Sequence, residues 1–418
     1  MKIEFNVKPY QGFMDIKVSY EKEKIHQDYF YLNRDFIINR FYIDGVKYDV
    51  IDNTELISLE TFDGYKVNKY SLPQSFQKII IEYTGKLTGE TGCCPYVRET
   101  ISPDFTLIRF ETFCYPMFCK DDIHSIIDFI NSSADINLTA VVPSEFAIAS
   151  DADEIENYSA DGMTNYVFKS KTFGFNMAVA KYIIKNLSVG KFYLLGEIDI
   201  NQVENIMKTA HDFMNANFGS REISGLNYIA IPDYLGGFAK PNALFVGTNT
   251  FDSIQSMNHI IHEFIHLGWN VPADNETKRI RFFDEAFTSY FEMRVMEYLL
   301  KDNYKLNDFI NAYKNQINNG FDDNIPIIDF GKHEYGDLSY TIGAICLYKL
   351  SDFVGLDVFE KATTIFLGKY KNTPVNMEIF CNEYIKLCNT PGLEQFFNDW
   401  IYTINGPKSL FILAEVII

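Results

Sequence analysis

Two histidines and a glutamate lie close together in the segment NHIIHEFIHLGWN, which covers residues 258–270. His262 and His266 are four residues apart, and Glu263 directly follows the first of them. On a helix with about 3.6 residues per turn, side chains four residues apart lie one above the other. Two imidazoles at this spacing can bind one zinc ion, and the glutamate between them lies close to the metal without having to ligate it.

The surrounding residues predict that this segment is a helix. Apolar residues recur along it at helical spacing: Ile254, Met257, Ile260, Ile261, Phe264 and Ile265. Asp252 is suited to cap its start, with Gln255 three residues later as the capping-box partner. Gly268 marks its predicted end. A helix would hold both imidazoles on a rigid backbone.

A catalytic zinc site usually has three protein ligands and keeps a fourth position for water. A second helical pattern, RFFDEAFTSYFEMRVMEYLL, lies downstream, and eighteen residues separate Glu285 within it from His266. This separation leaves room for a turn, so that the second helix can run antiparallel to the first and direct Glu285 toward the imidazoles. Asp284 and Glu292 are candidates for hydrogen bonds to the ligands. The sequence therefore predicts one zinc ion per chain.

A purely structural role is the alternative for each of these residues. His262 and His266 would then be core or surface histidines, and Glu285 would be a solvated helix residue. His259 lies one turn earlier on a similar face. We expect His259 to be structural, because three ligands are already assigned.

The elements that must position these residues differ along the chain. Short β-branched and aromatic runs, separated by turn residues, dominate the first ~190 residues and predict a sandwich or saddle of strands: MDIKVSY, FIINRFYIDGV, KIIIEYTG, FTLIRFETF and INLTAVVP. DINQVENIMKTAHDFMNANFG then predicts a helix that stops at Gly219, LNYIAIPDY and NALFVG predict strands, and the chain after residue 252 is mostly helical. We expect an α+β protein with a β-rich domain at 1–188 and a mostly helical domain at 189–418.

Composition narrows the class of protein further. The 418 residues are 47% hydrophobic and 22% charged, which indicates a globular chain of more than one domain. A net charge of −19 without a dense Lys/Arg run argues against a nucleic-acid partner. The start does not resemble a signal peptide, and no apolar run reaches the roughly 18 residues of a membrane span. Among the seven cysteines there is no CxxC pair, so we expect a cytoplasmic protein with reduced thiols.

Beyond the zinc pattern, the chain resembles the gluzincin aminopeptidases, the family that includes alanyl aminopeptidase and leukotriene A hydrolase. HEFIH, the eighteen-residue spacer and DEAFTSYFE carry the resemblance, which is specific over residues 228–350. INLTAVVPSEFAIAS, FMNANFGSREISGLNYIAIPDY and FFNDWIYTINGP extend it over about residues 90–407. The resemblance implies a thermolysin-like zinc peptidase domain after a β-rich domain. It stops before the family's large C-terminal helical domain, so we expect a short form.

The family's catalytic tyrosine also has a counterpart. The family pattern Ser-Tyr-x-Lys-Gly-Ala is similar to LSYTIGAICLYKL, which places Tyr340 at the tyrosine and Ile342 at the usual lysine. The resemblance implies that Tyr340 donates its phenolic hydrogen to the oxyanion of a tetrahedral intermediate. The alternative is a tyrosine packed in a helical core.

The family's substrate-binding strand departs from its usual pattern here. Relatives carry Gly-x-Met-Glu-Asn, whose glutamate binds the free amino group of the substrate, whereas LGGFAKPNALFVG at 235–247 has Lys240 and Pro241 where Met and Glu would be expected. The strand could still pair with a peptide backbone. Lys240 could attract a carboxylate or be a solvated edge lysine. The substrate-binding candidates are Gly236, Gly237, Phe238 and Ala239.

The sequence thus predicts a zinc metallopeptidase, a hydrolase that acts on a peptide substrate in an aminopeptidase-like manner with altered recognition of the substrate's amino terminus. Glu263 would take the proton of the attacking water and pass it to the leaving amine. Three alternatives remain: an endopeptidase, a hydrolase of a non-peptide molecule at the same site, and a non-catalytic scaffold of the same fold.

Overall fold

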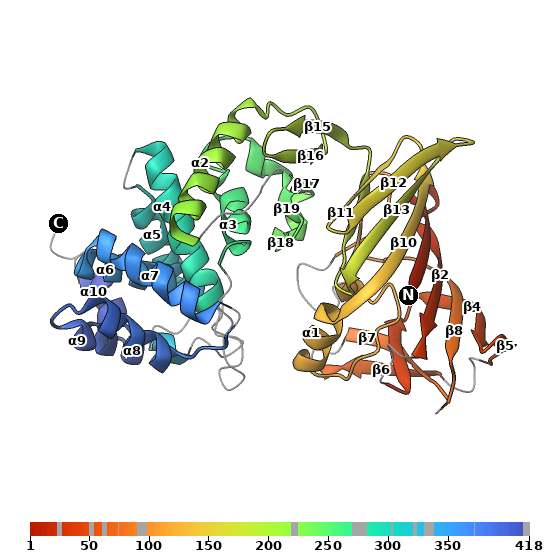
Figure 1. Ribbon diagram of the computed structural model, residues 1–418, viewed down its shortest axis with the longest axis horizontal. Coiled ribbons are helices and arrows are strands. Elements are labelled where there is room, and N and C mark those ends of the chain that lie inside the picture. The colour runs from red at the N-terminus through yellow and green to blue at the C-terminus, as the bar shows by residue number, and fades with distance from the viewer. Residues whose placement is uncertain are drawn as a thin grey trace. The chain divides into compact units, whose positions relative to one another are not determined.

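The computed structural model describes residues 1–22, 27–49, 54–60, 65–73, 75–89, 98–218, 225–269, 282–301, 304–320, 324–329, 338–371 and 373–412. Two compact units make up the chain, one rich in strands and one largely helical (Figure 1). The first comprises Met1–Ile198 and Ser224–Asn249, and the second comprises Asp199–Ile223 and Thr250–Ile418. A β-rich part followed by a mostly helical part is the predicted fold class. The domain boundary at 188/189 stays a prediction.

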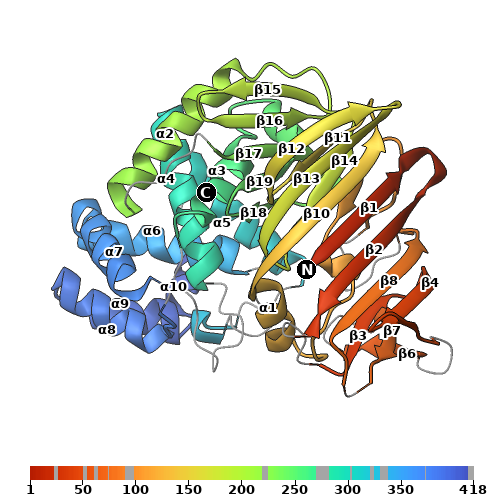
Figure 2. The ribbon, with the colours of Figure 1, turned by 45° about the vertical axis from the view of Figure 1, so that its right-hand side comes forward.

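An eight-stranded sheet, in the order β12-β13-β10-β1-β2-β8-β4-β5, forms the largest layer of the first unit. Figure 2 shows β13, β10, β1, β2 and β8 side by side. Its strands are β1 (Lys2–Lys8), β2 (Phe13–Glu21), β4 (Phe36–Ile43), β5 (Val46–Lys47), β8 (Lys78–Gly85), β10 (Ser133–Pro143), β12 (Asp153–Ala160) and β13 (Met163–Thr172). β1 and β10 run parallel, and the other neighbours are antiparallel. Every second residue of β1 and β2 is buried, as a sheet with one covered face requires.

Two three-stranded sheets accompany this layer, in the orders β3-β7-β6 and β11-β14-β9. They consist of β3 (Tyr29–Asn33), β6 (Thr54–Leu59), β7 (Tyr65–Ser71), β9 (Thr106–Ile108), β11 (Ala147–Ser150) and β14 (Met177–Ala180). Buried residues from all three sheets form one large hydrophobic core rich in Phe and Tyr. The sequence did not predict helix α1 (Ile123–Asn131), whose N-cap Asp122 accepts a 2.8 Å hydrogen bond from the Ser125 N–H.

A five-stranded mixed sheet, in the order β15-β16-β17-β19-β18, also belongs to the first unit. Its strands are β15 (Ile183–Leu187), β16 (Gly190–Leu194), β17 (Asn227–Ile231), β18 (Phe238–Lys240) and β19 (Ala243–Gly247). The central strands β16, β17 and β19 are parallel, and their apolar runs are buried. β18 pairs with β19 and ends the sheet as an edge strand. LNYIAIPDY and NALFVG therefore contain strands, as predicted.

The second unit is built from helices. They are α2 (Asn201–Phe218), α3 (Asn258–His266), α4 (Phe287–Leu300), α5 (Tyr304–Asn318), α6 (Ala344–Val354), α7 (Leu356–Tyr370), α8 (Met377–Cys388), α9 (Leu393–Phe397) and α10 (Asn405–Ile412). Among the described residues, π-helical turns adjoin them at η8 (Phe282–Ala286), η11 (Ser339–Gly343) and η12 (Asn398–Tyr402). α3 packs against α4, which also contacts α2, α5 and α6. Gly219, the predicted stop of the α2 pattern, lies outside the described residues.

The predicted start of the zinc-motif helix at Asp252 is wrong. α3 begins at Asn258, and the residues before it form a turn. In this turn Ser253 Oγ accepts a 3.1 Å hydrogen bond from the Ser256 N–H, and Ser256 Oγ accepts one of 3.0 Å from the Ser253 N–H. These serines form the reciprocal pair that was expected of Asp252 and Gln255, so the helix starts later.

No helix in the part of the chain that the structure describes is both long enough and apolar enough to cross a membrane.

Gly85 tests how tightly the eight-stranded sheet packs. A Cβ atom at Gly85 would lie 1.2 Å from Phe36 Cδ1, the ring of its cross-strand neighbour. We expect Gly85→Ala to lower the free energy of unfolding by about 1–3 kcal/mol, because the ring must leave its place. Chemical denaturation measures the change.

Gly368 in α7 is the matched control, because a Cβ atom there meets nothing within 4 Å. Gly368→Ala should raise the free energy of unfolding by about 0.5–1 kcal/mol through helix propensity. Equal effects of the two substitutions would contradict the packing described here.

Candidate metal centre

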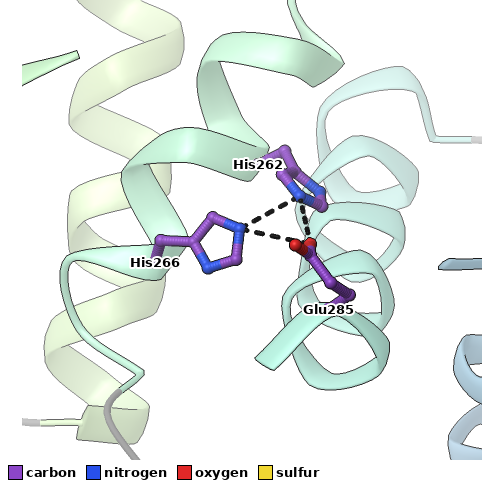
Figure 3. Close-up of side chains that lie close together, drawn as sticks. All are labelled: His262, His266 and Glu285. Carbon is purple, nitrogen blue, oxygen red and sulfur yellow. Dashed lines mark hydrogen bonds and ion pairs between the residues drawn. The ribbon is translucent and has the colours of Figure 1, made fainter. Parts of the chain in front are cut away.

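Three side chains from two separate segments converge in the second unit (Figure 3). His262 Nε2 lies 3.2 Å from His266 Nε2 and 3.1 Å from Glu285 Oε2, and His266 Nε2 lies 3.3 Å from the same carboxylate oxygen. Donor atoms of a tetrahedral zinc site, each about 2.0–2.1 Å from the metal, are about 3.3 Å apart. The three atoms therefore match one face of such a tetrahedron, and the group could hold a metal ion.

Helix α3 presents both histidines on one side. It buries Ile260, Ile261, Phe264 and Ile265. The side chains of His262 and His266 keep 12% and 17% of their exposure, so both remain accessible. Their ring centroids are 4.8 Å apart at an interplanar angle of 80°, which lets the two Nε2 atoms approach each other. His259, expected to be structural, is exposed and lies outside this group.

Glu285 reaches the histidines from the π-helical turn η8, at the start of α4. Its side chain is only 4% exposed. A carboxylate at this burial is costly unless it is paired with a cation or coordinates a metal. The two imidazoles supply such a partner when protonated, and a metal ion supplies it when they are neutral.

A second carboxylate contacts His262 at Nδ1, the ring nitrogen that does not face Glu285. Glu292 Oε2 lies 3.1 Å from His262 Nδ1, and Asn258 Nδ2 donates a 3.0 Å hydrogen bond to Glu292 Oε1. A histidine whose Nδ1–H donates to a carboxylate has its Nε2 lone pair free for a metal. The predicted contact of Glu292 with a ligand is thus present in the geometry, and Asn258 fixes the carboxylate.

His266 has a similar arrangement on its Nδ1 side. Asp284 Oδ1 lies 3.0 Å and Thr288 Oγ1 lies 3.2 Å from His266 Nδ1. The Thr288 hydroxyl donates a 2.7 Å hydrogen bond to the Asp284 carbonyl, so its oxygen is the acceptor toward the ring. Both contacts favour the tautomer that carries its hydrogen on Nδ1 and leaves the Nε2 lone pair available for a metal.

These contacts shift the pKa values of the two imidazoles strongly. Burial alone would lower the pKa of His262, but hydrogen bonds with Glu285 and Glu292 outweigh it and raise that pKa to about 9. Burial also opposes protonation of His266, and Asp284 and Glu285 raise its pKa to about 10. Without a metal, these carboxylate contacts favour the protonated form of the rings. Metal binding at Nε2 must therefore displace protons.

Glu263 lies on the same helix, between the two histidines. Burial raises the pKa of its carboxyl group, and the charges of His262 and His266 lower it. Glu263 is half-buried, and its carboxyl group lies close enough to both rings for their charges to affect its pKa.

Tyr340 lies beside the three converging side chains. It belongs to the π-helical turn η11, and its ring stacks on His262 with a centroid separation of 5.8 Å and an interplanar angle of 20°. Its side chain is half-buried. The structure therefore places Tyr340 at the edge of the candidate centre.

The substrate-binding candidates all belong to the first unit. Gly236 follows a short 3-10 turn with φ of 66°, and Phe238 and Ala239 lie on the edge strand β18. Lys240 Nζ lies 5.7 Å from the centre of the Phe110 ring, a cation–π contact. A role of Gly236, Gly237, Phe238 and Ala239 in substrate binding stays a prediction.

Three residues near the centre were missed by sequence reasoning. Asn258 and Thr288 could have been found as polar residues one helical turn from His262 and Asp284. Trp269 gave no local signal. Its indole N–H donates to the Phe283 carbonyl, and its ring stacks on Phe287 with a centroid separation of 4.1 Å. The indole thus joins the end of the histidine segment to the turn that carries Glu285.

Comparison with solved structures shows the fold to be shared. The M1 zinc metallopeptidase from Deinococcus radiodurans matches with a TM-score of 0.62 and 11% sequence identity, over 96% of this chain and 92% of that chain. Leukotriene A4 hydrolase from Saccharomyces cerevisiae matches with a TM-score of 0.63 and 13% identity, over 96% of this chain and 67% of that chain. At these identities the likeness establishes the fold alone. No protein-family model and no curated protein matches the chain.

Thr288 tests the contacts behind the ligands. We expect Thr288→Val, which keeps the shape but removes the hydroxyl beside His266 Nδ1, to weaken zinc binding by about 10-fold or more. Chelator competition measures the affinity. Thr364→Val is the control, because the Thr364 hydroxyl makes the same kind of bond, 2.9 Å to the Glu360 carbonyl, on an exposed part of α7. Equal affinities in both variants would contradict this role of Thr288.

The raised histidine pKa values predict a pH dependence of stability. Both values, about 9 and about 10, lie above the ordinary value of 6.5. The protonated rings therefore stabilise the metal-free fold fully below about pH 6.5, and this contribution is lost as pH rises through 9–10. We expect the Tm of chelator-treated protein to fall over this range, and His262→Gln to reduce the fall. A fall of the same size in His262→Gln would refute the assignment.

Proposed function

We propose that the protein is a zinc-dependent metallopeptidase, similar in activity to the gluzincin aminopeptidases that its sequence resembles. The observation that carries the proposal is the convergence of His262, His266 and Glu285, with Glu263 on the same helix. The shared fold adds support. One solved structure with this fold is a variant M1 zinc metallopeptidase bound to a Tyr-Ser-Ala substrate, and another is yeast leukotriene A4 hydrolase in complex with bestatin.

His262, His266 and Glu285 are the residues that would hold one zinc ion per chain. Zinc in such a site lowers the pKa of a bound water to about 7 and polarises a carbonyl group. Glu292 and Asp284 keep the Nε2 atoms of the two rings available for the metal, through contacts of 3.1 and 3.0 Å to Nδ1.

Glu263 is the proposed general base. Its carboxylate takes a proton from the attacking water and then hands it to the leaving amine, so that one group serves both halves of the reaction. Burial supports this role because it raises the pKa of the Glu263 carboxyl group. A weakly basic carboxylate would hold the transferred proton less readily.

Tyr340 is the proposed hydrogen-bond donor to the oxyanion that develops on the substrate carbonyl. Its stacking on His262 supports this role, because it holds the phenol beside the ligands. Deleting a donor of this kind typically costs about 10²–10³-fold in kcat.

We also propose that β18 aligns the substrate. It is an edge strand with β19 on one side, and an extended peptide can pair with an edge of this kind. Lys240 and Pro241 replace the residues that recognise a free amino terminus in the relatives. The cation–π contact of Lys240 with Phe110 favours a structural role for this lysine over capture of a carboxylate. The proposed activity is therefore aminopeptidase-like cleavage with altered recognition of the substrate's amino terminus.

The non-catalytic scaffold has less support. Such a protein needs neither the proposed base nor a paired carboxylate behind each histidine. Here Glu292 and Asp284 both lie within 3.1 Å of an imidazole nitrogen. The Glu292 side chain is only 7% exposed, and a buried carboxylate is costly unless it is paired or serves a metal site.

Glu263→Gln provides the test of the proposed function. We expect hydrolysis of peptides to fall by about 10²–10⁴-fold, because the amide cannot accept the proton, while one zinc ion per chain is retained. Mass spectrometry of a mixed peptide library measures cleavage, and metal analysis measures zinc. His259→Gln, on the exposed side of the same helix, is the control and should keep full activity.

If Glu263→Gln hydrolyses peptides as fast as the wild type, Glu263 is not the general base. If the variant loses its zinc, Glu263 acts as a metal ligand instead. In the wild type, the positions of the cuts separate the peptidase classes. Cuts that begin at a free amino terminus support the aminopeptidase-like activity, whereas internal cuts would assign an endopeptidase. A wild type that contains zinc but cuts no peptide would contradict the proposal.

A further inference from the structure

Two functional side chains stand on two neighbouring π-helical turns. Glu285 lies on η8, which leads into α4, and Tyr340 lies on η11, which leads into α6. The two turns pack against each other in the second unit. π-helical turns are rare in proteins, and those that occur often lie at functional sites. The contact between these turns therefore sets how far Tyr340 lies from the candidate metal ligands.

Gly343 of η11 lies against Ala286 of η8. A Cβ atom at Gly343 would lie 2.8 Å from Ala286 Cβ and 3.5 Å from Phe282 Cδ2. The backbone itself does not require glycine, since Gly343 has the ordinary helical angles φ −61° and ψ −48°. The need for glycine at this position comes only from the lack of room for a Cβ atom beside Ala286. The missing methyl group lets η11 lie directly against η8.

Both turns are buried, and they differ in the contacts that hold them. Phe282 and Phe283 of η8 both pack on Phe380, with ring centroids 5.6 and 5.9 Å apart, and Trp269 donates to the Phe283 carbonyl. Phe282 and Ala286 are fully buried. η8 is thus held in a close-packed aromatic core, where displacement is costly.

The other turn has an adjustable contact. The Thr341 hydroxyl of η11 donates a 2.6 Å hydrogen bond to the Gln316 side-chain carbonyl on α5. Gln316 has a flexible side chain that can follow a small shift. A methyl group at Gly343 would therefore displace η11, and with it Tyr340, while Glu285 stays in place.

We propose that Gly343 is a positioning residue, which sets the place of the Tyr340 phenol relative to the histidines through its close contact with Ala286. This inference rests on the proposed function for its kinetic consequence, but the displacement itself needs no substrate. Tyr340 lies one turn before Gly343, and its ring stacks on His262 at 5.8 Å. A shift of η11 therefore acts directly on this stacking.

The variants Gly343→Ala and Ala286→Gly/Gly343→Ala test the inference. In the double variant the new Cβ meets no Cβ at residue 286, and its distance to the Ala286 Cα position, 3.8 Å, is an ordinary contact. We expect the single variant to lose about 10–100-fold in kcat with little change in KM or zinc content, because a displacement near 1 Å can cost 10²-fold. The double variant should recover most of the loss. Gly368→Ala controls for the added methyl group itself.

A double-mutant cycle with Tyr340→Phe separates positioning from general damage. If Gly343 acts through the phenol, Gly343→Ala lowers kcat in the wild-type background and has little further effect in Tyr340→Phe. An equal loss in both backgrounds, or failure of Ala286→Gly to restore activity, would overturn the inference. If Gly343→Ala is too unstable to purify, the double variant must match the wild type in kcat, and a low kcat there would also overturn it.

Crystal structures of the wild type and Gly343→Ala supply a readout that is independent of activity. A larger separation between the Tyr340 and His262 rings in the variant is expected, with the distances among His262, His266 and Glu285 unchanged. An unchanged Tyr340 position would refute the positioning role even in a protein that cleaves no peptide. A displaced Tyr340 in a protein without hydrolysis would leave this inference intact and refute the proposed function.

Discussion

The burial of one carboxylate between two imidazoles is the constraint on which the centre depends. Glu285 is almost completely removed from water, and its oxygen lies within 3.3 Å of both Nε2 atoms. A charge in that position requires a cation, either as protons on the histidines or as a metal ion. The carboxylates on the far side of each ring make the protonated form stable, and they also make the neutral rings better ligands. The same contacts therefore serve the metal-free and the metal-bound states.

The helical unit holds this arrangement by aromatic packing. The indole of Trp269 donates to the Phe283 carbonyl and so joins the end of the histidine segment to η8, the turn that carries Glu285. Twelve residues lie between Trp269 and Phe282, the first residue of η8. Phe380 packs on the Phe282 and Phe283 rings of the same turn. Interiors packed at this density resist small displacements, which is what a metal site and a neighbouring phenol both need. The geometry of the centre is thus a property of the core beneath it.

Much of this arrangement could be predicted from the sequence. The HExxH spacing indicated a helix with both histidines on one side, and the eighteen-residue spacer pointed to Glu285. Short β-branched and aromatic runs separated by turn residues predicted a β-rich first unit. The start of α3 was predicted too early, since two serines rather than Asp252 and Gln255 organise the turn before it.

Other features of the centre depend on contacts that no local pattern reveals. The π-helical turns are one example, because a single widened turn scarcely alters the spacing of apolar residues. The need for glycine at residue 343 is another, since it arises from the methyl group of Ala286 on a distant segment. Asn258 and Thr288 lie one helical turn from His262 and Asp284, but this spacing does not tell which carboxylate or imidazole each of them contacts.

X-ray absorption spectroscopy of the zinc-loaded protein tests the central claim most directly. The account predicts one zinc ion per chain, surrounded by nitrogen and oxygen atoms at about 2.0–2.1 Å, with the multiple-scattering signal of two imidazoles. Replacement of Glu285 by Gln should change this shell while both imidazoles remain. Sulfur neighbours at about 2.3 Å, or a shell that is indifferent to Glu285, would place the zinc elsewhere in the chain and contradict the account.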